Sequence, residues 1–400
     1  MMNIFVINSG SSSIKYQLIK MPEAALICSG LIDRIGLGNS SITHKTYKEE
    51  IENVYKETAD IVDHAMGLKE VARLLTNTDF GVIKDPAEIK VVGHRVVHGG
   101  ESFSKTTIIT PEVKEEIKKL FPLAPLHNPP NLLGIEVAEK IFSNAKQVAV
   151  FDTAFHQTMP AVAYRYAIPK KFYSEQGIRA YGFHGTSHKY VSATAAKYLQ
   201  NPNAKIITIH LGNGCSMAAV HAGKCMDTTM GIGPINGLIM GTRSGDIDQS
   251  VIFYMVNQLG YTTEQVNTIL NKNSGMLGLT GFSDMRDIRA EIEKGNKEAI
   301  LAYDLYAYRI RKYIGAYSAV LNGLDAIVFT AGVGENDALT RKLSSSNLEF
   351  LGIKLDEFKN SAAEKGIREI NTTDSVVKIL IIPTNEELEI AKQCFTLLDK

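Results

Sequence analysis

The sequence predicts an α/β fold in which a nucleotide-binding unit is duplicated. Three stretches support this prediction. Each has a run of apolar, β-branched residues followed by a glycine-rich turn, and two of them continue into a second apolar run, as in a β-hairpin. They are residues 3–19, residues 205–220 (KIITIHLGNGCSMAAV) and residues 326–336, which end in AGVGEN.

The glycine-rich turns favour an anionic ligand. Gly212 and Gly214 lack a Cβ atom and permit positive φ, so backbone N–H groups can face one concavity, where phosphate is the usual anion. Taken alone, NSGSSS (residues 8–13) fits an ordinary hairpin loop, and TAGVGEN (residues 330–336) fits a plain strand-to-helix turn. The repetition of the pattern favours a nucleotide site.

Length and composition limit the function classes. A chain of 400 residues predicts two domains. Lys+Arg and Asp+Glu both number 43, which gives no support to a nucleic-acid or anionic-membrane partner. No apolar run of roughly 18 residues predicts a membrane span, and MMNIFVINSG lacks a basic signal-peptide region. The four cysteines form no C-x-x-C pair, so we expect a cytoplasmic protein.

Strand and helix patterns alternate along the chain, which predicts the α/β class. The apolar positions Ile51, Val54 and Tyr55 follow a helical spacing that continues into a helix predicted for residues 60–77. In the first half we further predict a hairpin with a third strand in 1–35, strands at 89–97 and 146–151, helices at 111–120 and 132–142, and an extended loop at FPLAPLHNPPN (121–131). In the second half we predict helices at 187–199, 249–259, 263–271, 297–321 and 386–398, a hairpin at 205–220, and strands at 326–329 and 376–382.

Several familiar motifs are not matched. The nearest approach to a Walker A loop, at Gly223, lacks its first glycine and its hydroxyl, and GVGEND at 332–337 stops short of G-x-G-x-x-G. The pairs His94/His98 and His184/His188 have an i, i+4 spacing, but the glutamate of H-E-x-x-H is missing. A zinc site is therefore not favoured.

Polar residues recur where predicted strands end, which is where α/β folds bind ligands. Any one of them fits a helix cap or a surface ion pair equally well, but the set favours a functional site. Its members are Asn8, Lys15, Arg95, Asp152, His184, Arg243, Asp284, Arg286, Asn385 and Glu386.

A series of motifs spread over essentially the whole chain closely resembles those of the acetokinase family, the acetate kinases. In order they are NSGSSSIKY, GHRVVHGG, PLHNPPN, FDTAFH, YGFHGTSH, HLGNGCSM, MDTTMG, GTRSGD, SDMRD, AGVGEN and PTNEE. The resemblance implies a duplicated ribonuclease H-like (actin-like ATPase) fold with two lobes and a nucleotide cleft between them. The lobes are residues 1–152, with helix 386–400 packing back on them, and residues 153–385.

The resemblance also implies roles for residues of this chain. Asp152, His184 and Arg243 are expected to be catalytic, although acetate is already ionised at neutral pH and needs no general base, so we expect Asp152 to have a positioning or metal-water role. Asn8 and Glu386 are expected to hold Mg²⁺, with Mn²⁺ as an alternative metal. Arg95 is expected to bind the substrate carboxylate. The residues expected to surround the methyl group are Val97, Leu126, Phe183 and Pro234. ATP binding falls to Lys15, His210, Leu211, Gly212, Asn213, Gly214, Asp284, Met285, Arg286, Gly332, Val333, Gly334, Glu335 and Asn336.

The implied reaction is reversible, Mg²⁺-dependent, in-line phosphoryl transfer from ATP to acetate, giving acetyl phosphate, by a cytoplasmic homodimer. A propionate or butyrate kinase is the alternative within the family, because one methylene changes binding by only about 1–3 kcal/mol. An ATP-switched scaffold of the Hsp70 or actin type is the alternative outside it. That class would leave Arg95, Asp152, His184 and Arg243 without a purpose.

Overall fold

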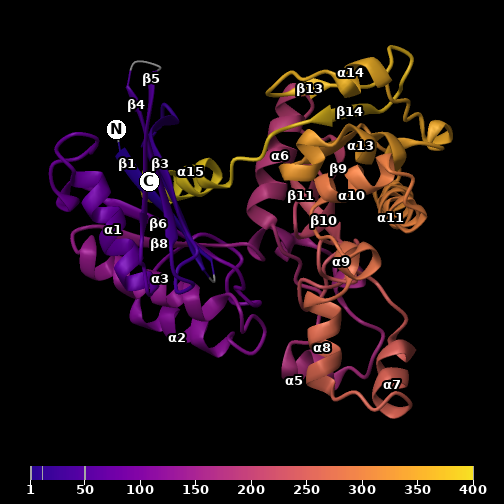
Figure 1. Cartoon of the computed structure of the whole chain (residues 1–400), viewed down its shortest axis with the longest axis horizontal. Helices are drawn as coiled ribbons and strands as arrows, with labels where there is room; N and C mark the ends of the chain where they lie inside the picture. Colours follow the sequence, from indigo (N-terminus) through magenta and orange to yellow (C-terminus); the bar gives the residue numbers. More distant parts are fainter. Residues whose placement is uncertain (1, 11, 49–50, 400) are drawn as a thin grey trace. The chain divides into compact units, whose positions relative to one another are not determined.

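The computed structural model describes residues 2–10, 12–48 and 51–399. The chain forms two compact units: Met1–Phe155 together with Asn385–Lys400, and His156–Thr384. The terminal helix α15 (Glu386–Leu398) therefore belongs to the first unit, and Figure 1 shows it beside that unit's sheet. The boundaries of the units lie within a few residues of those predicted for the lobes. The separate functions of the two lobes stay a prediction.

The first unit is built on an eight-stranded sheet with the order β5-β4-β3-β2-β1-β6-β8-β7. Strands β1 to β5 are antiparallel neighbours, whereas β1, β6 and β8 run parallel, so their carboxyl ends share one edge. The strands are β1 (Met2–Ser9), β2 (Ser13–Met21), β3 (Ala25–Asp33), β4 (Ser40–Lys48), β5 (Ile51–Ala59), β6 (Val91–Val96), β7 (Thr107–Ile108) and β8 (Lys146–Phe151).

The sheet is buried on both faces at β1, whose successive side chains point to opposite sides. Phe5 and Ile7 pack in a core with helices α1 (His64–Thr76) and α3 (Asn128–Ile141), whereas Ile4 and Val6 pack against α15. Burying each such side chain stabilises the fold by about 1.5–3 kcal/mol. Helix α2 (Pro111–Lys119) covers a third cluster near the end of β8.

The second unit contains a six-stranded sheet with the order β11-β10-β9-β12-β14-β13. Its strands are β9 (Lys205–Leu211), β10 (Cys215–His221), β11 (Lys224–Thr228), β12 (Ala326–Thr330), β13 (Arg368–Glu369) and β14 (Lys378–Ile381). Helix α6 (Gly185–Tyr198) packs on one side of β9 and β12, and α11 (Lys297–Leu321) packs on β10. The other helices of this unit are α4 (Ala161–Tyr164), α5 (Lys171–Gln176), α7 (Gln249–Asn257), α8 (Thr263–Lys272), α9 (Gly275–Thr280), α10 (Met285–Glu293), α12 (Ala331–Asn336), α13 (Ala338–Ser345) and α14 (Glu357–Ser361).

The two sheets repeat one strand pattern, which confirms the predicted duplication. The order β3-β2-β1-β6-β8 of the first sheet corresponds to β11-β10-β9-β12-β14 of the second. In each case a hairpin comes first, one further strand pairs in parallel with its inner strand, and the next strand pairs in parallel with that one. Three short 3₁₀ helices at Pro86–Glu88, Ala154–Thr158 and Glu349–Leu351 complete the elements.

The helical interpretation that starts at Ile51 is wrong. Ile51, Val54 and Tyr55 lie in β5, which pairs along its length with β4, and neither strand was predicted. Strand β5 mixes apolar and polar residues on both faces, and Ile51 is 62% exposed. Its sequence therefore lacks the apolar alternation by which a half-buried strand is recognised.

Two segments predicted as irregular are partly helical. Helix α3 begins at Asn128, inside the stretch predicted as an extended loop, because Pro129 and Pro130 occupy its first turn, where no N–H is needed. The segment Ala331–Asn336, predicted as a glycine-rich turn, forms α12. Gly212 and Gly214 do not use positive φ.

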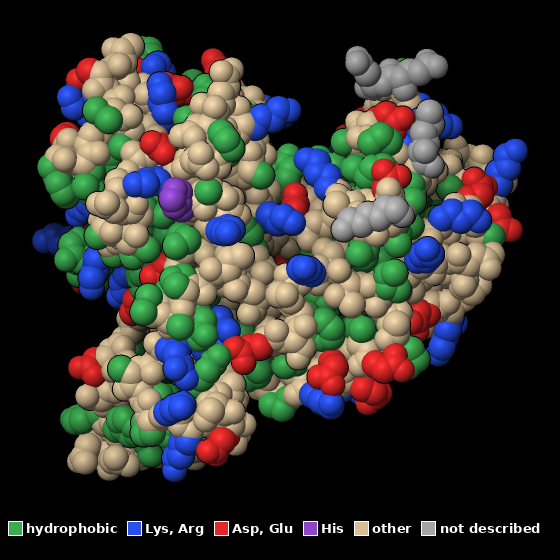
Figure 2. Space-filling model, turned by 180° about the vertical axis from the view of Figure 1, so that it is seen from behind, with side chains coloured by type: hydrophobic (Ala, Val, Ile, Leu, Met, Phe, Trp, Pro, Cys, Tyr) green, Lys and Arg blue, Asp and Glu red, His purple; other side chains and the backbone are tan. Residues whose placement is uncertain are grey.

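Charged side chains of both signs are interspersed over the face seen in Figure 2, in agreement with the equal numbers of acidic and basic residues. Among the described residues, none of the helices has the length and apolar character needed to cross a bilayer.

Candidate active site

In the first unit, side chains from the ends of β1, β6 and β8 meet the start of α15. Arg95 donates hydrogen bonds from Nε (2.9 Å) and Nη2 (2.5 Å) to Oδ2 of Asp152, which is almost fully buried. Its Nη1 donates to Oδ1 of Asn8 at 3.3 Å, and its Nε lies 3.9 Å from Oε2 of Glu386. The structure thus brings together four residues that are far apart in the sequence.

This cluster holds more negative than positive charge. Burial alone would lower the pKa of Arg95, but the carboxylates of Asp152 and Glu386 raise it, so Arg95 is a permanent cation. Burial raises the pKa of Glu386 to about 7; Arg95 opposes the rise, and Asp152 and Glu387 add to it. The charge on Glu386 is therefore poorly compensated near neutral pH.

Lys15 reaches the same edge from β2. Its Nζ forms a 2.8 Å ion pair with Glu387, whose side chain is only 5% exposed. Glu387 was not predicted as a site residue. Its position beside Glu386 in PTNEE was the available signal, but adjacent positions on a helix face different directions, so the spacing gave no reason to choose both.

In the second unit, His184 is held in a strained backbone conformation. It is the N-cap of α6 with φ 56° and ψ 25°, the left-handed region that a residue other than glycine rarely adopts. Its Nδ1 lies 2.9 Å from Oγ of Ser216, and its ring stacks on that of His210 with centroids 4.3 Å apart. A Cβ atom on Gly214 would lie 3.4 Å from the His184 ring, in ordinary van der Waals contact, so this turn passes directly beside the ring.

Arg243 lies near the same ring. A Cβ atom on Gly214 would also lie 3.7 Å from its Nη1, which donates a 2.8 Å hydrogen bond to the carbonyl of Pro234. Burial lowers the pKa of Arg243, and no carboxylate is among the causes of its shift. A half-buried cation of this kind favours an anionic ligand.

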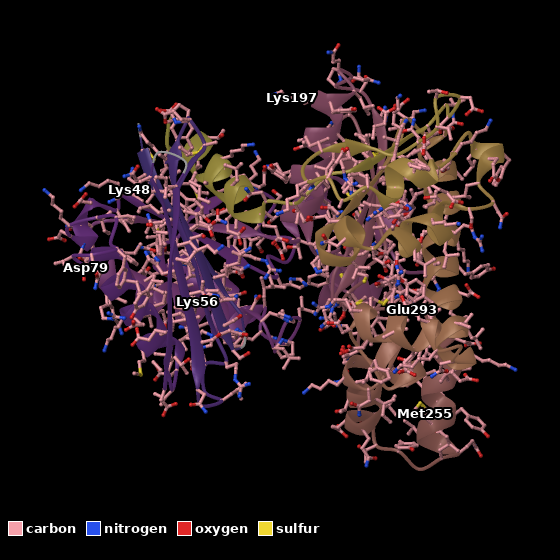
Figure 3. The ribbon with its side chains drawn as sticks, turned by 45° about the horizontal axis from the view of Figure 1, so that its top comes forward. Lys48, Lys56, Asp79, Lys197, Met255 and Glu293 are labelled. Carbon is pink, nitrogen blue, oxygen red and sulfur yellow. The ribbon has the colours of Figure 1, made fainter. Side chains whose placement is uncertain are left out.

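A cavity of about 710 Å³ opens within the second unit. That volume is in the range of a cofactor-sized pocket. The cavity is lined at one end by the turn after β9 and by α12, and at another by the first turn of α10; in Figure 3, Glu293 marks the opposite end of α10. Eight of the predicted ATP residues line it: Gly212, Asn213, Asp284, Met285, Arg286, Gly332, Val333 and Asn336.

The remaining predicted ATP residues of this unit lie outside the lining of the cavity. His210 and Leu211 are buried in β9, and Gly214 lies beside His184. Gly334 contributes its carbonyl to a hydrogen bond from Arg341, and Glu335 accepts one from the N–H of Thr384. Sequence reasoning missed Gly241, Met276, Ser283, Arg289, Tyr306 and Asp337, which line the cavity.

The rim of the cavity carries an exposed ion pair. Arg286 and Asp284 form a 2.6 Å contact, which lowers the pKa of Asp284 to about 2. Met285, between them, is 9% exposed and presents its thioether toward the lining. On the inner wall, the hydroxyl of Tyr306 lies 3.3 Å from Sγ of Cys215.

The four residues predicted to surround the substrate methyl group are placed differently. Val97 (4% exposed) and Phe183 (2% exposed) are buried in the first and second units. Pro234 contacts Arg243 through its carbonyl, and Leu126 is 59% exposed. Each therefore has a defined place within its own unit, and their shared pocket stays a prediction.

The donor atoms near Glu386 fit a hard divalent cation. Among the residues that the structure describes, no group of three or more His, Cys, Asp or Glu side chains is arranged to hold a metal. Asn8 and Glu386 do supply an amide and a carboxylate oxygen, and the excess negative charge around Glu386 would be offset by a cation. Mg²⁺ characteristically takes one or two protein carboxylates and completes its shell with waters and phosphate oxygens.

Comparison with known proteins gives concordant results. A sequence profile of the acetokinase family matches residues 3–392. An acetate kinase of Flavobacterium johnsoniae is 61% identical over 398 residues, with 100% of both chains covered. An acetate kinase of Methanosarcina acetivorans is 51% identical over 394 residues, which cover 98% of this chain and 96% of that one.

Solved structures agree with these sequence matches. The crystal structure of an acetate kinase from Porphyromonas gingivalis matches with a TM-score of 0.92 and 42% identity over 100% of both chains. A propionate kinase from Francisella tularensis matches with a TM-score of 0.90 and 42% identity, covering 99% of this chain and 100% of that one.

Proposed function

The chain belongs to the acetokinase family, and from this premise we propose that it catalyses reversible phosphoryl transfer between ATP and acetate, giving ADP and acetyl phosphate. The observation that carries the proposal is the full-length match to relatives named acetate kinase. The fold is the duplicated, actin-like ATPase fold that the sequence predicted.

We assign the cavity of the second unit to the nucleotide. Its volume suits a nucleoside, and it is lined by backbone at Gly212 and Gly332 as well as by the apolar side chains of Met276 and Met285. Methionine adapts its shape and interacts favourably with aromatic rings, which suits a purine base. His210 to Gly214 would then carry the phosphates toward His184 and Arg243.

We assign the acetate carboxylate to Arg95. A guanidinium has five N–H donors, and the contacts with Asp152 and Asn8 use Nε–H, one N–H of Nη2 and one of Nη1. One N–H remains on each of Nη1 and Nη2, which is the arrangement that a second carboxylate can bind through both oxygens. Asp152 is therefore a positioning residue for Arg95 in this proposal, and acetate, already ionised, requires no general base.

The reaction needs positive charge around the transferred phosphoryl group, because the acceptor is itself an anion. In this proposal Arg243, which is half-buried, and the imidazolium of His184 supply that charge from the protein. Asn8 and Glu386 would hold Mg²⁺, and this ion when bound would neutralise charge on the phosphate oxygens. Lys15, which forms an ion pair with Glu387, is assigned to ATP binding by the family resemblance.

A propionate kinase is the second candidate, because the structure of one such enzyme matches nearly as well as that of an acetate kinase. Detection of the acyl phosphate as its hydroxamate, with acetate, propionate and butyrate as acceptors, separates the two. The proposal requires the highest kcat/KM with acetate. A higher value with propionate would assign the second candidate, and no acyl phosphate from any acceptor would overturn both.

Two further assignments rest on the family. We propose a cytoplasmic location, supported by four cysteines that are all unpaired and buried. We also propose a homodimer, which light scattering of the purified protein tests directly.

A further inference from the structure

A line of hydrogen-bonding side chains leads from His184 into the sheet of the second unit. Nδ1 of His184 lies 2.9 Å from Oγ of Ser216, and the same Oγ lies 2.7 Å from Nε2 of His188. Nδ1 of His188 lies 2.7 Å from Oγ1 of Thr208, which in turn donates to the carbonyl of Ala218 at 3.4 Å.

The line is shielded from water. Ser216, His188 and Thr208 are each 0% exposed. His184 and His188 are one turn apart at the start of α6, while Ser216 lies on β10 and Thr208 on β9. Because no solvent can exchange with these groups, each hydrogen has to be donated to the next member of the line.

When His184 is positively charged, the hydrogen bonds along the line can have only one donor-to-acceptor direction. An imidazolium has a hydrogen on both nitrogens, so Nδ1–H must donate to Ser216. Ser216 then has its single hydrogen left for Nε2 of His188. His188 must therefore carry its hydrogen on Nδ1 and donate it to Thr208, which passes its own to the carbonyl of Ala218. Every donor in this direction has an acceptor.

His188 is suited to the neutral role that this direction requires. Burial lowers its pKa well below the usual value, and the nearby His156 and His210 lower it further. The ring of His184 stacks on that of His210, and the guanidinium of Arg243 lies near it across Gly214, so this neighbouring cation disfavours a positive charge on His184. A hydrogen-bond acceptor for its Nδ1–H therefore stabilises the imidazolium form of His184.

We propose that Ser216, His188 and Thr208 are positioning residues that keep the hydrogen of neutral His184 on Nδ1 and stabilise its imidazolium form. This inference deepens the proposed function, because it rests on His184 acting as a cation in phosphoryl transfer. No bond forms or breaks along the line. It fixes which nitrogen of His184 gains a proton, namely Nε2.

Thr208→Val tests the proposal without altering His184 or its contacts. Valine has nearly the shape of threonine but no hydroxyl, so Nδ1–H of His188 would lose its acceptor. The hydrogen of His188 then moves to Nε2, the line reverses, and Ser216 donates to Nδ1 of His184. We expect the alkaline decline of kcat to shift toward lower pH by about one unit. Thr208→Ser restores the hydroxyl and should restore the position of this decline.

A matched control accounts for the loss of a buried hydroxyl elsewhere in the sheet. Thr228 is buried and donates its hydroxyl hydrogen to the carbonyl of Met217, which lies between Ser216 and Ala218 on β10 but is not a member of the line. Thr228→Val should leave the alkaline limb of the profile in place. If Thr208→Val melts too early for kinetics, Ser216→Ala removes the acceptor of His184 directly and should produce the same shift. Profiles of Thr208→Val or Ser216→Ala that superimpose on that of the parent would overturn the proposal.

A spectroscopic readout separates this proposal from the proposed function. In protein with ¹⁵N-labelled histidine, with the His184 signal assigned from His184→Ala, the parent should show neutral His184 protonated at Nδ1, and Thr208→Val should show it protonated at Nε2. An unchanged tautomer would end the proposal regardless of the kinetics. Full kcat in His184→Ala would instead remove His184 from the proposed function. The tautomer shift between the parent and Thr208→Val could still be observed in that case.

Discussion

Replacing Glu386 by glutamine should make the protein more stable and less active. Glu386 lies 3.9 Å from Arg95, but Asp152 already holds that cation through two hydrogen bonds. Asp152 and Glu387 add negative charge around it. Glutamine keeps the shape and the oxygen of glutamate and removes the charge. Activity should fall because the proposed metal ligand loses its charge.

The size of the gain follows from the pKa of Glu386, which is raised from 4.5 to about 7. A raised pKa means that the folded protein prefers the protonated carboxyl, so its stabilising effect is complete below pH 4.5 and is lost as pH rises through 7. The shift corresponds to about 3 kcal/mol, an upper limit because the side chain remains 20% exposed to screening solvent. In a unit of this size, that corresponds to roughly 6–12 °C in Tm.

Thermal melts of parent and Glu386→Gln, recorded from pH 5 to pH 8 in EDTA, measure the effect. The Tm difference should be small at pH 5 and largest at pH 8, and Mg²⁺ should then raise the Tm of the parent more than that of the variant. Glu115→Gln, at a side chain 64% exposed in the same unit, controls for the substitution itself and should show no pH-dependent gain. A Tm difference that is constant across this range, or a variant less stable at pH 8, would refute the charge argument.

Substitutions at four other positions test the proposed roles. Arg95→Ala should chiefly raise KM for acetate, and Arg243→Ala should chiefly lower kcat by roughly 10²–10³-fold, because the first contacts the ground state and the second meets charge that develops later. Steady-state kinetics, recorded beside thermal melts, distinguish these two effects from a loss of stability. If both variants were merely unstable, both kinetic defects would scale with the unfolded fraction. His184→Gly should be about 1 kcal/mol more stable than His184→Ala in denaturant titrations, because glycine relieves the left-handed conformation; equal stability would contradict the strain. Gly241→Ala would place a Cβ atom 2.1 Å from Oδ1 of Asn213 in the cavity wall, so calorimetry should show ATP binding weakened by about tenfold. Unchanged affinity would place the nucleotide elsewhere.

Elements with long, continuous patterns were predicted best from the sequence. The helices Lys297–Leu321 and Glu386–Leu398 and the strand Lys146–Phe151 have the predicted boundaries. Capping explains part of this agreement, because Asn296 accepts hydrogen bonds from two N–H groups at the start of the first helix, and Asn322 ends it in a left-handed conformation. Strands β4 and β5 were missed because their pairing partners, rather than their own composition, stabilise them.

The residues of the candidate site also fall into those that the sequence predicts and those that it does not. Residues such as Arg95 and Asp152 were predicted because they lie at strand ends, where α/β folds bind ligands, and because they are charged. Tyr306 was missed because one aromatic residue in a long helix looks like any core residue until the cavity beside it is known. Partners such as Ser216 depend on the register between β9 and β10, in which Ser216 lies opposite His210, and register of this kind is not visible in a single sequence.

The return of α15 to the first unit has a consequence for biosynthesis. Ile390 and Cys394 belong to the core beneath β1, so the first unit contains a gap that only a segment made after the whole of the second unit can fill. At roughly 5–20 residues per second, translation of the second unit delays that segment by tens of seconds. The second unit, continuous in sequence, can fold during this interval, whereas the first waits with part of its apolar surface open. Because Glu386 and Glu387 arrive with the same segment, a chain released early lacks both the missing core residues and the carboxylates of the proposed site.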